Sequence, residues 1–192
     1  MRPANATGKT ILSCTATSEP TSFASVFLRR SGFENPPVEP EVTSAYSLEP
    51  DHLFTPEELW PELVAACQEF GFYPEIVAGM IRQESTWHNY RVHRDGHGHG
   101  LLGLDDNGLL RDFEPWAGIE VGRGEHAIII PVEPQLRFAA YQLRRYMDAY
   151  PDVMADPYIA CGAWHRSGAQ RNSPEAVAYQ KLIQKHVQER FS

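Results

Sequence analysis

The stretch Pro74-Glu75-Ile76-Val77-Ala78-Gly79-Met80-Ile81-Arg82-Gln83-Glu84-Ser85 combines a helix start with an acidic side chain in an unusual position. Proline favours the first position of a helix, where its missing N–H costs no hydrogen bond. Four apolar side chains then share one helix face: Ile76, Val77, Met80 and Ile81. At about 100° per residue, Glu84 lies only about 20° from Val77 on that wheel. The stretch therefore predicts a helix with one glutamate on its apolar face.

The position of Glu84 has a chemical consequence. Burial disfavours the ionised form of a carboxyl group and raises its pKa, which a general acid needs in order to stay protonated near neutral pH. Two structural roles compete with this interpretation. Glu84 could form an ion pair with an arginine such as Arg82 or Arg144, or it could lie at a frayed helix end. The wheel alone leaves all three open.

Helix signals recur on both sides of this segment. Thr55-Pro56-Glu57-Glu58 is a capping box with proline at the first helical position, and Gly71 is a suitable left-handed C-cap. Apolar stripes predict further helices over 133–150 and 157–165, and a cap at Ser173 predicts a last helix after it. The chain should therefore be mostly helical from residue 53 onward.

Two segments lack helical periodicity. Between residues 95 and 108, five glycines predict turns or a small hairpin. Residues 1–52 hold six of the chain's 15 prolines and predict an extended N-terminal arm or linker, in which residues 22–30 either dock on the domain or a partner chain or form a partly ordered tail. The predicted fold class is α+β, predominantly α, with residues 53–192 as one domain that includes a small glycine-rich β-lobe.

Composition excludes several classes of function. With 17 Lys and Arg against 25 Asp and Glu, the formal net charge is −8, so nucleic acid is not an expected partner. No run approaches the roughly 20 apolar residues of a membrane span, and the first residues lack the apolar core of a signal peptide. Cys67 and Cys161 are predicted to be buried and unpaired, and the three cysteines show no metal-ligand spacing. We therefore expect no cofactor and no bound metal.

Four short elements follow one another along the chain: Ile81-Arg82-Gln83-Glu84-Ser85, Gly98-His99-Gly100-Leu101-Leu102-Gly103-Leu104-Asp105, Ala160-Cys161-Gly162-Ala163-Trp164-His165-Arg166-Ser167-Gly168 and Ala178-Tyr179-Gln180-Lys181. Their order and spacing resemble the lysozyme-like superfamily, most closely soluble lytic transglycosylases and goose-type lysozymes. In that family a helix ends in a Glu-Ser pair and a Gly-Leu-Met-Gln type segment follows in a small β-lobe. An Ala-Tyr-Asn-x-Gly type segment ends a later helix, and a tyrosine lies near the start of the last helix. The resemblance covers about residues 53–186.

The resemblance implies a lysozyme-like fold and an enzyme that degrades peptidoglycan, either a lytic transglycosylase or a muramidase. Its partner would be the glycan strands, cut at the β-1,4 bond between N-acetylmuramic acid and N-acetylglucosamine. Glu84 matches the family's general acid, Ser85 the serine beside it and Tyr179 the tyrosine of the last helix.

The sequence departs from the family at positions that would touch the sugar. Leu102 stands at the methionine position, and the glutamine position falls on Gly103 or, in a second alignment, on Asp106. Trp164 and His165 replace the Tyr-Asn pair, which keeps an aromatic ring and a polar neighbour but loses the amide. These departures affect the predicted details of sugar binding and leave the assignment of the acid unchanged.

The role of a second carboxylate stays open at this stage. If Asp105 or Asp95 lies across the cleft from Glu84, with the carboxyl groups about 6.5 to 9.5 Å apart, a water molecule fits between them and hydrolysis inverts the anomeric centre. If neither does, the resemblance implies that Glu84 acts first as acid and then as base, forming an anhydro sugar. Asp95 and Asp106 also fit ordinary turn positions.

Sugar binding calls for aromatic side chains, because pyranose faces stack on rings while hydroxyl groups bind polar rims. The aromatic candidates are Trp87, Tyr90, Trp164 and Tyr179. The other candidate substrate-binding residues are Ser85, Leu102, Asp106 and His165. For Trp60 and Trp116 we expect core packing.

Two other classes of function compete with the glycosidase. The histidine cluster His88, His93, His97 and His99 would suit a zinc peptidase, but it lacks the usual spacing of zinc ligands. A non-catalytic lysozyme-like protein with a structural or assembly role is the other alternative. The acidic charge, the missing signal peptide and the arm over 1–52 favour a bacteriophage virion or tail component whose arm binds other virion proteins. An endolysin made in the host cytoplasm is the remaining possibility for its location.

Overall fold

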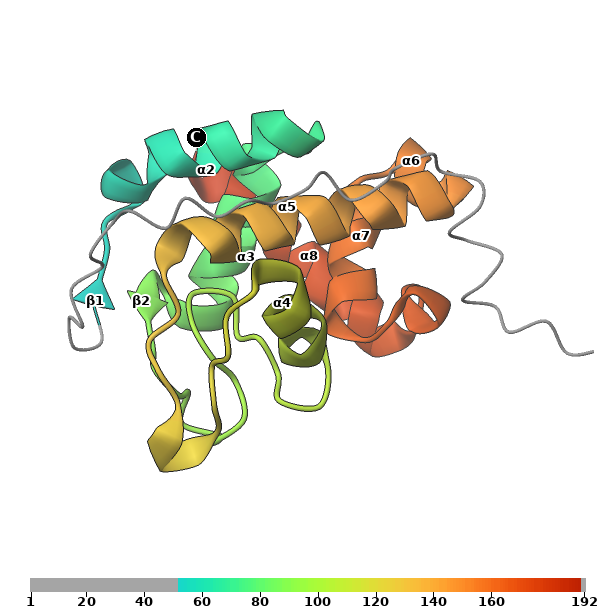
Figure 1. Cartoon of the computed structure of the whole chain (residues 1–192). Coiled ribbons are helices and arrows are strands. Elements are labelled where there is room, and N and C mark those ends of the chain that lie inside the picture. The colour runs from blue at the N-terminus through green and yellow to red at the C-terminus, as the bar shows by residue number, and fades with distance from the viewer. Residues whose placement is uncertain (1–51, 191–192) are drawn as a thin grey trace, which may run out of the picture. The chain divides into compact units, whose positions relative to one another are not determined.

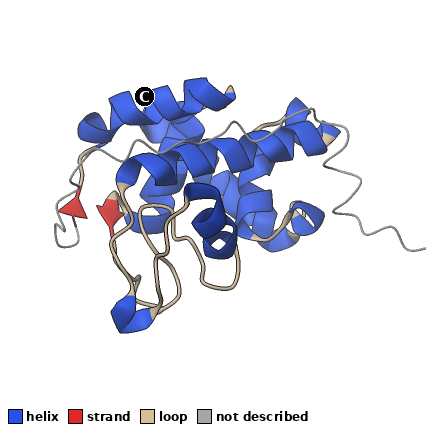
Figure 2. Cartoon of the chain, viewed as in Figure 1, coloured by secondary structure: helices blue, strands red, loops and turns tan. Residues whose placement is uncertain are grey.

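The computed structural model describes residues 52–190, which all belong to one unit of the chain, residues 45–192. This part is predominantly helical, as predicted, and its strands are very short (Figure 2). The expected N-terminal arm and its segment 22–30 lie outside the described residues. No helix within residues 52–190 is both long and apolar enough to cross a bilayer.

The elements of the described part are labelled in Figure 1. In chain order they are β1 (His52–Leu53), α2 (Pro56–Phe70), α3 (Pro74–Ser85), β2 (His88–Asn89), α4 (Leu109–Ala117), η1 (Gly124–His126), α5 (Val132–Ala149), α6 (Pro151–Ala155), α7 (Tyr158–His165), η2 (Gly168–Gln170) and α8 (Pro174–Arg190). Helices α2, α3, α5, α7 and α8 confirm the five predicted helices within a residue or two at each end. Helices α4 and α6 were not predicted.

Local signals explain where α2 begins and ends. The Oγ1 atom of Thr55 accepts a hydrogen bond from the backbone N–H of Glu58, and the Glu58 carboxylate accepts one from the backbone N–H of Thr55. These two bonds form the predicted capping box. Gly71 ends the helix with a φ of 66°, in the left-handed region that glycine adopts without strain.

Helix α5 runs through the middle of the helices in Figure 1 and carries the centre of the core. The Phe138 ring on α5 lies edge-on to Phe113 of α4, at a centroid distance of 5.4 Å, and also contacts Trp164 of α7. Trp116 lies against Phe138 from α4. Helix α2 packs on α5, while α3 and α7 both pack on α8. The expected core packing of Trp60 and Trp116 is confirmed, since both are partly buried against this cluster.

The small sheet is formed by segments other than those expected. Strands β1 and β2 pair in antiparallel fashion, with His52 opposite Asn89 and Leu53 opposite His88. The glycine-rich residues 95–108 contain turns, and no regular strand is assigned within them. The only isolated bridge in the described residues joins Tyr90 to Gly100. The strand pairing therefore lies beside the glycine-rich segment instead of within it.

Helices α4 and α6 lack the signals that revealed the others. Helix α4 contains Pro115, has no side-chain cap at Gly108, and buries only Leu110 and Phe113 among its nine residues. Helix α6 has five residues and starts at Pro151, the proline that also prevents α5 from continuing. Both helices are too short for a helical pattern of apolar residues to be recognised in the sequence.

Candidate active site

Glu84 lies in the last turn of α3, on the side that packs into the protein. Helix α3 ends directly after it because Thr86 adopts a left-handed conformation, with a φ of 52°. Burial of the Glu84 carboxyl group raises its pKa from 4.5 to about 7. Of the two structural alternatives, an ion pair is not observed, because Arg82 pairs with Glu189 and Arg144 with Asp148.

Tyr179, on α8, is the hydrogen-bond donor to Glu84. Its side chain is 6% exposed, and its hydroxyl group donates to Oε1 of Glu84. This bond favours the ionised carboxylate and lowers the pKa of Glu84, so it offsets part of the effect of burial. Burial, together with the neighbouring Glu84 charge, raises the pKa of Tyr179 well above its ordinary value, which keeps the phenol a donor.

His165 forms the next layer outward from Tyr179. The two rings are stacked with their centroids 4.5 Å apart and their planes 2° from parallel. His165 is exposed, and partial desolvation lowers its pKa, which favours the neutral ring. The structure thus brings together Glu84, Tyr179 and His165 from α3, α8 and the end of α7.

Gly103 closes over the second oxygen of the Glu84 carboxyl group. A Cβ atom at residue 103 would lie 3.0 Å from Oε2 of Glu84, and the residue has a φ of +58°. Both facts favour glycine, because a side chain would strain the backbone and crowd the carboxyl group. In the first alignment, Gly103 occupies the glutamine position of the family, so this departure places bare backbone against the acid.

Asp95 and Asp105, the two candidates for a second carboxylate, both stabilise turns. Oδ1 of Asp95 accepts hydrogen bonds from the backbone N–H groups of His97 and Gly98, which lower the pKa of Asp95. The negative charge of Asp95 also contributes, after burial, to the raised pKa of Glu84. Asp105 is exposed and accepts from the backbone N–H of Asn107. Asp95 is therefore the better candidate for an ionised partner of Glu84.

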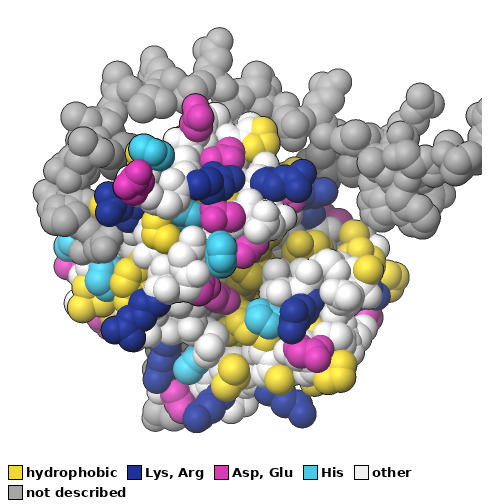
Figure 3. Space-filling view, turned by 90° about the horizontal axis from the view of Figure 1, so that it is seen from below, with side chains coloured by type: hydrophobic (Ala, Val, Ile, Leu, Met, Phe, Trp, Pro, Cys, Tyr) yellow, Lys and Arg dark blue, Asp and Glu magenta, His cyan; other side chains and the backbone are white. Residues whose placement is uncertain are grey.

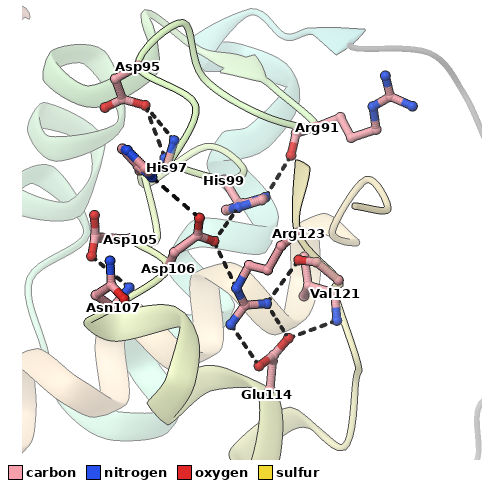
Figure 4. Close-up of polar contacts among 12 residues, drawn as sticks. Arg91, Asp95, His97, His99, Asp105, Asp106, Asn107, Glu114, Val121 and Arg123 are labelled. Carbon is pink, nitrogen blue, oxygen red and sulfur yellow. Dashed lines mark hydrogen bonds and ion pairs between the residues drawn. The ribbon is translucent and has the colours of Figure 1, made fainter. Parts of the chain in front are cut away.

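Asp106 is bound by other protein side chains. It accepts a hydrogen bond from His99 and forms an ion pair with Arg123, and Arg123 in turn binds Glu114 of α4, as Figure 4 shows. The Asp106 side chain is only 15% exposed. These contacts give Asp106 a structural role within the protein, and its contact with substrate stays a prediction.

Four of the other candidate substrate-binding residues are buried. Trp87 and Trp164 are 8% and 6% exposed and belong to the core cluster, and Leu102 has no exposed surface. Ser85 is also buried and donates its hydroxyl hydrogen to the carbonyl of Ile81. Because these side chains pack inward, we do not retain them in the proposed site. Tyr90 is partly buried and stacks on His88.

The histidine cluster does not converge on one point. His93 Nε2 lies 2.7 Å from the carbonyl oxygen of Gly100, and His99 contacts the carbonyl of Arg91 and the carboxylate of Asp106. Within residues 52–190, no group of three or more His, Cys, Asp or Glu side chains is arranged to hold a metal ion. Cys67 and Cys161 are buried and unpaired, as the sequence predicted.

One face of the described domain is hollowed, and hydrophobic side chains line the hollow (Figure 3).

Comparison of the chain with family models, with curated proteins and with solved structures gave no match in any of the three.

Proposed function

We propose that this protein is a glycosidase that cleaves the β-1,4 bond between N-acetylmuramic acid and N-acetylglucosamine in peptidoglycan, with Glu84 as the general acid. The observation that carries the proposal is the environment of Glu84. Its side chain is partly buried, its carboxyl group accepts a hydrogen bond from the Tyr179 hydroxyl and lies close to Gly103, and this environment raises its pKa to about 7. A carboxyl group in this state is still substantially protonated near neutral pH, so it can donate a proton to a leaving glycosidic oxygen.

The proposed mechanism divides the work between two carboxyl groups held in different states. Glu84 protonates the leaving oxygen while positive charge develops at the anomeric carbon. Asp95, whose backbone hydrogen bonds favour the ionised form, provides a negative charge near the site. Tyr179 orients the Glu84 carboxyl group through its hydrogen bond to Oε1. Two nearby acids whose pKa values are separated in this way can act as proton donor and as ionised stabiliser in glycoside cleavage.

The glycan would bind beside Glu84 and Tyr179, with His165 as a contact for a sugar ring. The exposure of His165 and its stacking on Tyr179 support this assignment.

Two chemical courses fit the site. If water attacks the anomeric carbon, the product is a reducing sugar, and if the muramic acid C6 hydroxyl attacks with Glu84 as base, the product is an anhydro sugar. Mass analysis of the released muropeptides distinguishes the two products.

The lysozyme-like fold and the delivery of the enzyme belong to the same proposal. The predominantly helical domain with a two-stranded sheet supports such a fold. The net charge of −8 would repel an anionic cell wall. Delivery within a bacteriophage virion or tail removes the need for electrostatic attraction, and we propose that location, with peptidoglycan as the target.

A second candidate function is a lysozyme-like structural or assembly protein without turnover. The burial of Trp87 and Trp164 favours it, because neither ring is available to form the aromatic wall of a sugar site. The two candidates differ in one measurable property, which is whether the protein releases fragments from peptidoglycan.

The test is the substitution Glu84→Gln, which keeps the size of the side chain and removes the proton that it would donate. We expect the release of fragments from purified peptidoglycan to fall by about 10²- to 10⁴-fold, the usual contribution of a general acid. Glu62→Gln, an exposed substitution on α2, is the matched control and should retain full activity. Equal activity of Glu84→Gln and wild type would refute the role of Glu84, and a wild type that releases nothing would favour the assembly protein.

A further inference from the structure

We propose that His99 and Asp106 are positioning residues that hold residues 91–106 against Glu84 and thereby keep water away from its carboxyl group. This inference rests on the proposed function for the role of Glu84, and it assigns no substrate contact to His99 or Asp106. The structural evidence is a set of polar contacts that begins at Arg91 and ends on α4 (Figure 4).

His99 is the centre of this arrangement. Its ring has no exposed surface. Nδ1 lies 2.8 Å from the backbone carbonyl oxygen of Arg91, and Nε2 lies 2.8 Å from Oδ1 of Asp106. Both partners are hydrogen-bond acceptors, so the His99 ring bridges the Arg91 carbonyl and the Asp106 carboxylate. One buried side chain thus ties the beginning of the segment to its end.

Asp106 extends the network to the rest of the domain. Nε of Arg123 lies 2.9 Å from Oδ1 of Asp106. The other two guanidinium nitrogens of Arg123 donate to the two carboxylate oxygens of Glu114, at 2.8 and 3.1 Å. Nδ1 of His97 lies 3.6 Å from Oδ2 of Asp106. The negative charge of Asp106 is therefore surrounded by groups that carry or can carry positive charge, and through Arg123 it is anchored to α4.

Backbone hydrogen bonds transmit this anchoring to Glu84. His99 and Leu104 exchange two of them, with N···O distances of 3.1 and 2.8 Å, and the N–H of Asp106 donates to the carbonyl of His97 at 3.0 Å. These bonds close the turn of residues 100–103. Gly103, the last residue of that turn, is the residue at which an added Cβ atom would lie 3.0 Å from Oε2 of Glu84, so the turn lies close to the carboxyl group. If the network is broken, the turn is free to move and water gains access to the carboxyl group.

The same segment carries the second group that acts on Glu84. Asp95 lies between Arg91 and His99 in the chain, and its charge contributes to the raised pKa of Glu84. The other groups that interact with the acid come from the helices and are independent of the network: Tyr179 on α8 and the buried thiol of Cys161 on α7. Loosening residues 91–106 should therefore lower the pKa of Glu84 through both greater hydration and a more distant Asp95.

The variants that test this inference leave Glu84 unchanged. Asp106→Asn keeps the shape of the side chain but removes its charge. Arg123→Gln breaks the network at its outer end, where the side chain is 38% exposed, so the domain should still fold. Glu125→Gln is the control, because that side chain is 89% exposed and belongs to the same part of the surface but not to the network.

The readout is the titration of the Glu84 carboxyl carbon, followed by NMR in protein labelled at glutamate and assigned with Glu84→Gln. We expect the midpoint to fall by about one pH unit in Asp106→Asn and by less in Arg123→Gln, with no change in Glu125→Gln. The alkaline limb of the pH–activity profile should move by the same amount, with kcat reduced more than KM is raised.

The result that would overturn the inference is a Glu84 midpoint that stays unchanged in Asp106→Asn and Arg123→Gln while their melting temperatures fall, because the network would then only stabilise the fold. Failure of the proposed function gives a different result from failure of the positioning inference. If the wild type cleaves no peptidoglycan but the midpoint moves in both variants, the positioning inference is supported and the glycosidase proposal is not.

Discussion

The helices of the domain and the loop region, residues 88–108, have different interiors. Between the helices, the fully buried side chains are apolar, with Phe138 at their centre. In the loop region, buried Asn89 and His99 alternate with apolar residues, and Gln135 reaches in from α5 to bind both Asn89 and the backbone N–H of Leu101. Contact between apolar side chains depends on shape alone, whereas each buried polar group needs a particular partner.

Glu84 lies where these two regions meet. Its helix and Tyr179 belong to the helical part, and Gly103 belongs to the loop region. The helices provide the hydrogen-bond donor Tyr179, and the loop region places Gly103 close to Oε2. The environment of the acid therefore depends on both regions, and variants in each region should affect it differently.

The largest effect on stability is expected for Phe138→Ala. The Phe138 side chain is 1% exposed and joins α4, α5 and α7 through three aromatic contacts. Its removal leaves a large cavity, so we expect a loss of about 3 to 5 kcal/mol in the free energy of unfolding, measured with denaturant. Met154→Ala, at a side chain that is 49% exposed, should cost less than about 1 kcal/mol. A small loss for Phe138→Ala would show that the helices do not depend on this core.

The next effect concerns the pH dependence of stability. The pKa of Glu84 is raised from 4.5 to about 7 on folding, so the folded state binds this proton more tightly than the unfolded state. The resulting stabilisation is fully present below about pH 4.5 and is lost as the pH rises through 7, a total of about 3 kcal/mol. The Glu84→Gln variant has no titrating carboxyl group at this position, so its stability lacks this pH-dependent contribution. From about pH 4 to about pH 8, unfolding experiments should therefore show the variant gaining stability relative to the wild type. Parallel curves for the two proteins would contradict this.

A smaller effect is expected for Gln135→Leu, which tests the loop region. The Gln135 amide accepts from the N–H of Leu101 and donates to Asn89 and to the carbonyl of Ile130. A leucine would remove the partners of the Leu101 N–H and of Oδ1 of Asn89, while the Ile130 carbonyl keeps its hydrogen bond from the Asn89 amide, so we expect a cost of about 2 kcal/mol in the free energy of unfolding. Gln142→Leu is the matched control on α5. Its amide oxygen accepts one bond, from Arg145, so its loss should be clearly smaller. Equal losses of stability in Gln135→Leu and Gln142→Leu would mean that the loop region does not depend on its buried hydrogen bonds more than α5 does.

The helical part of the fold could be predicted from the sequence because its signals are local. The apolar face of 74–85 and the capping box at Thr55 each lie within one helix. Helix α4 was missed because its proline and its uncapped start obscure a nine-residue pattern. The pairing of β1 with β2 joins residues about 36 positions apart, and no local signal indicates it.

The candidate site was predicted in part. The helical wheel placed Glu84 on a buried face, and the resemblance supplied Tyr179, which the structure shows bound to it. The network of Asp106 with Arg123 was not predicted, because its members come from separate turns and share no spacing. Trp87 was expected at a cleft but is buried, since aromatic character alone does not tell a core position from a binding position.

The most direct test of the central claim is the titration midpoint of Glu84 in the wild-type protein, resolved by carbon NMR at that single carboxyl group. The account predicts a midpoint near 7, with the carboxyl group still largely protonated just below neutral pH. A midpoint near 4.5, the ordinary value for a hydrated glutamate, would show that Glu84 is ionised under working conditions and would contradict its role as the general acid.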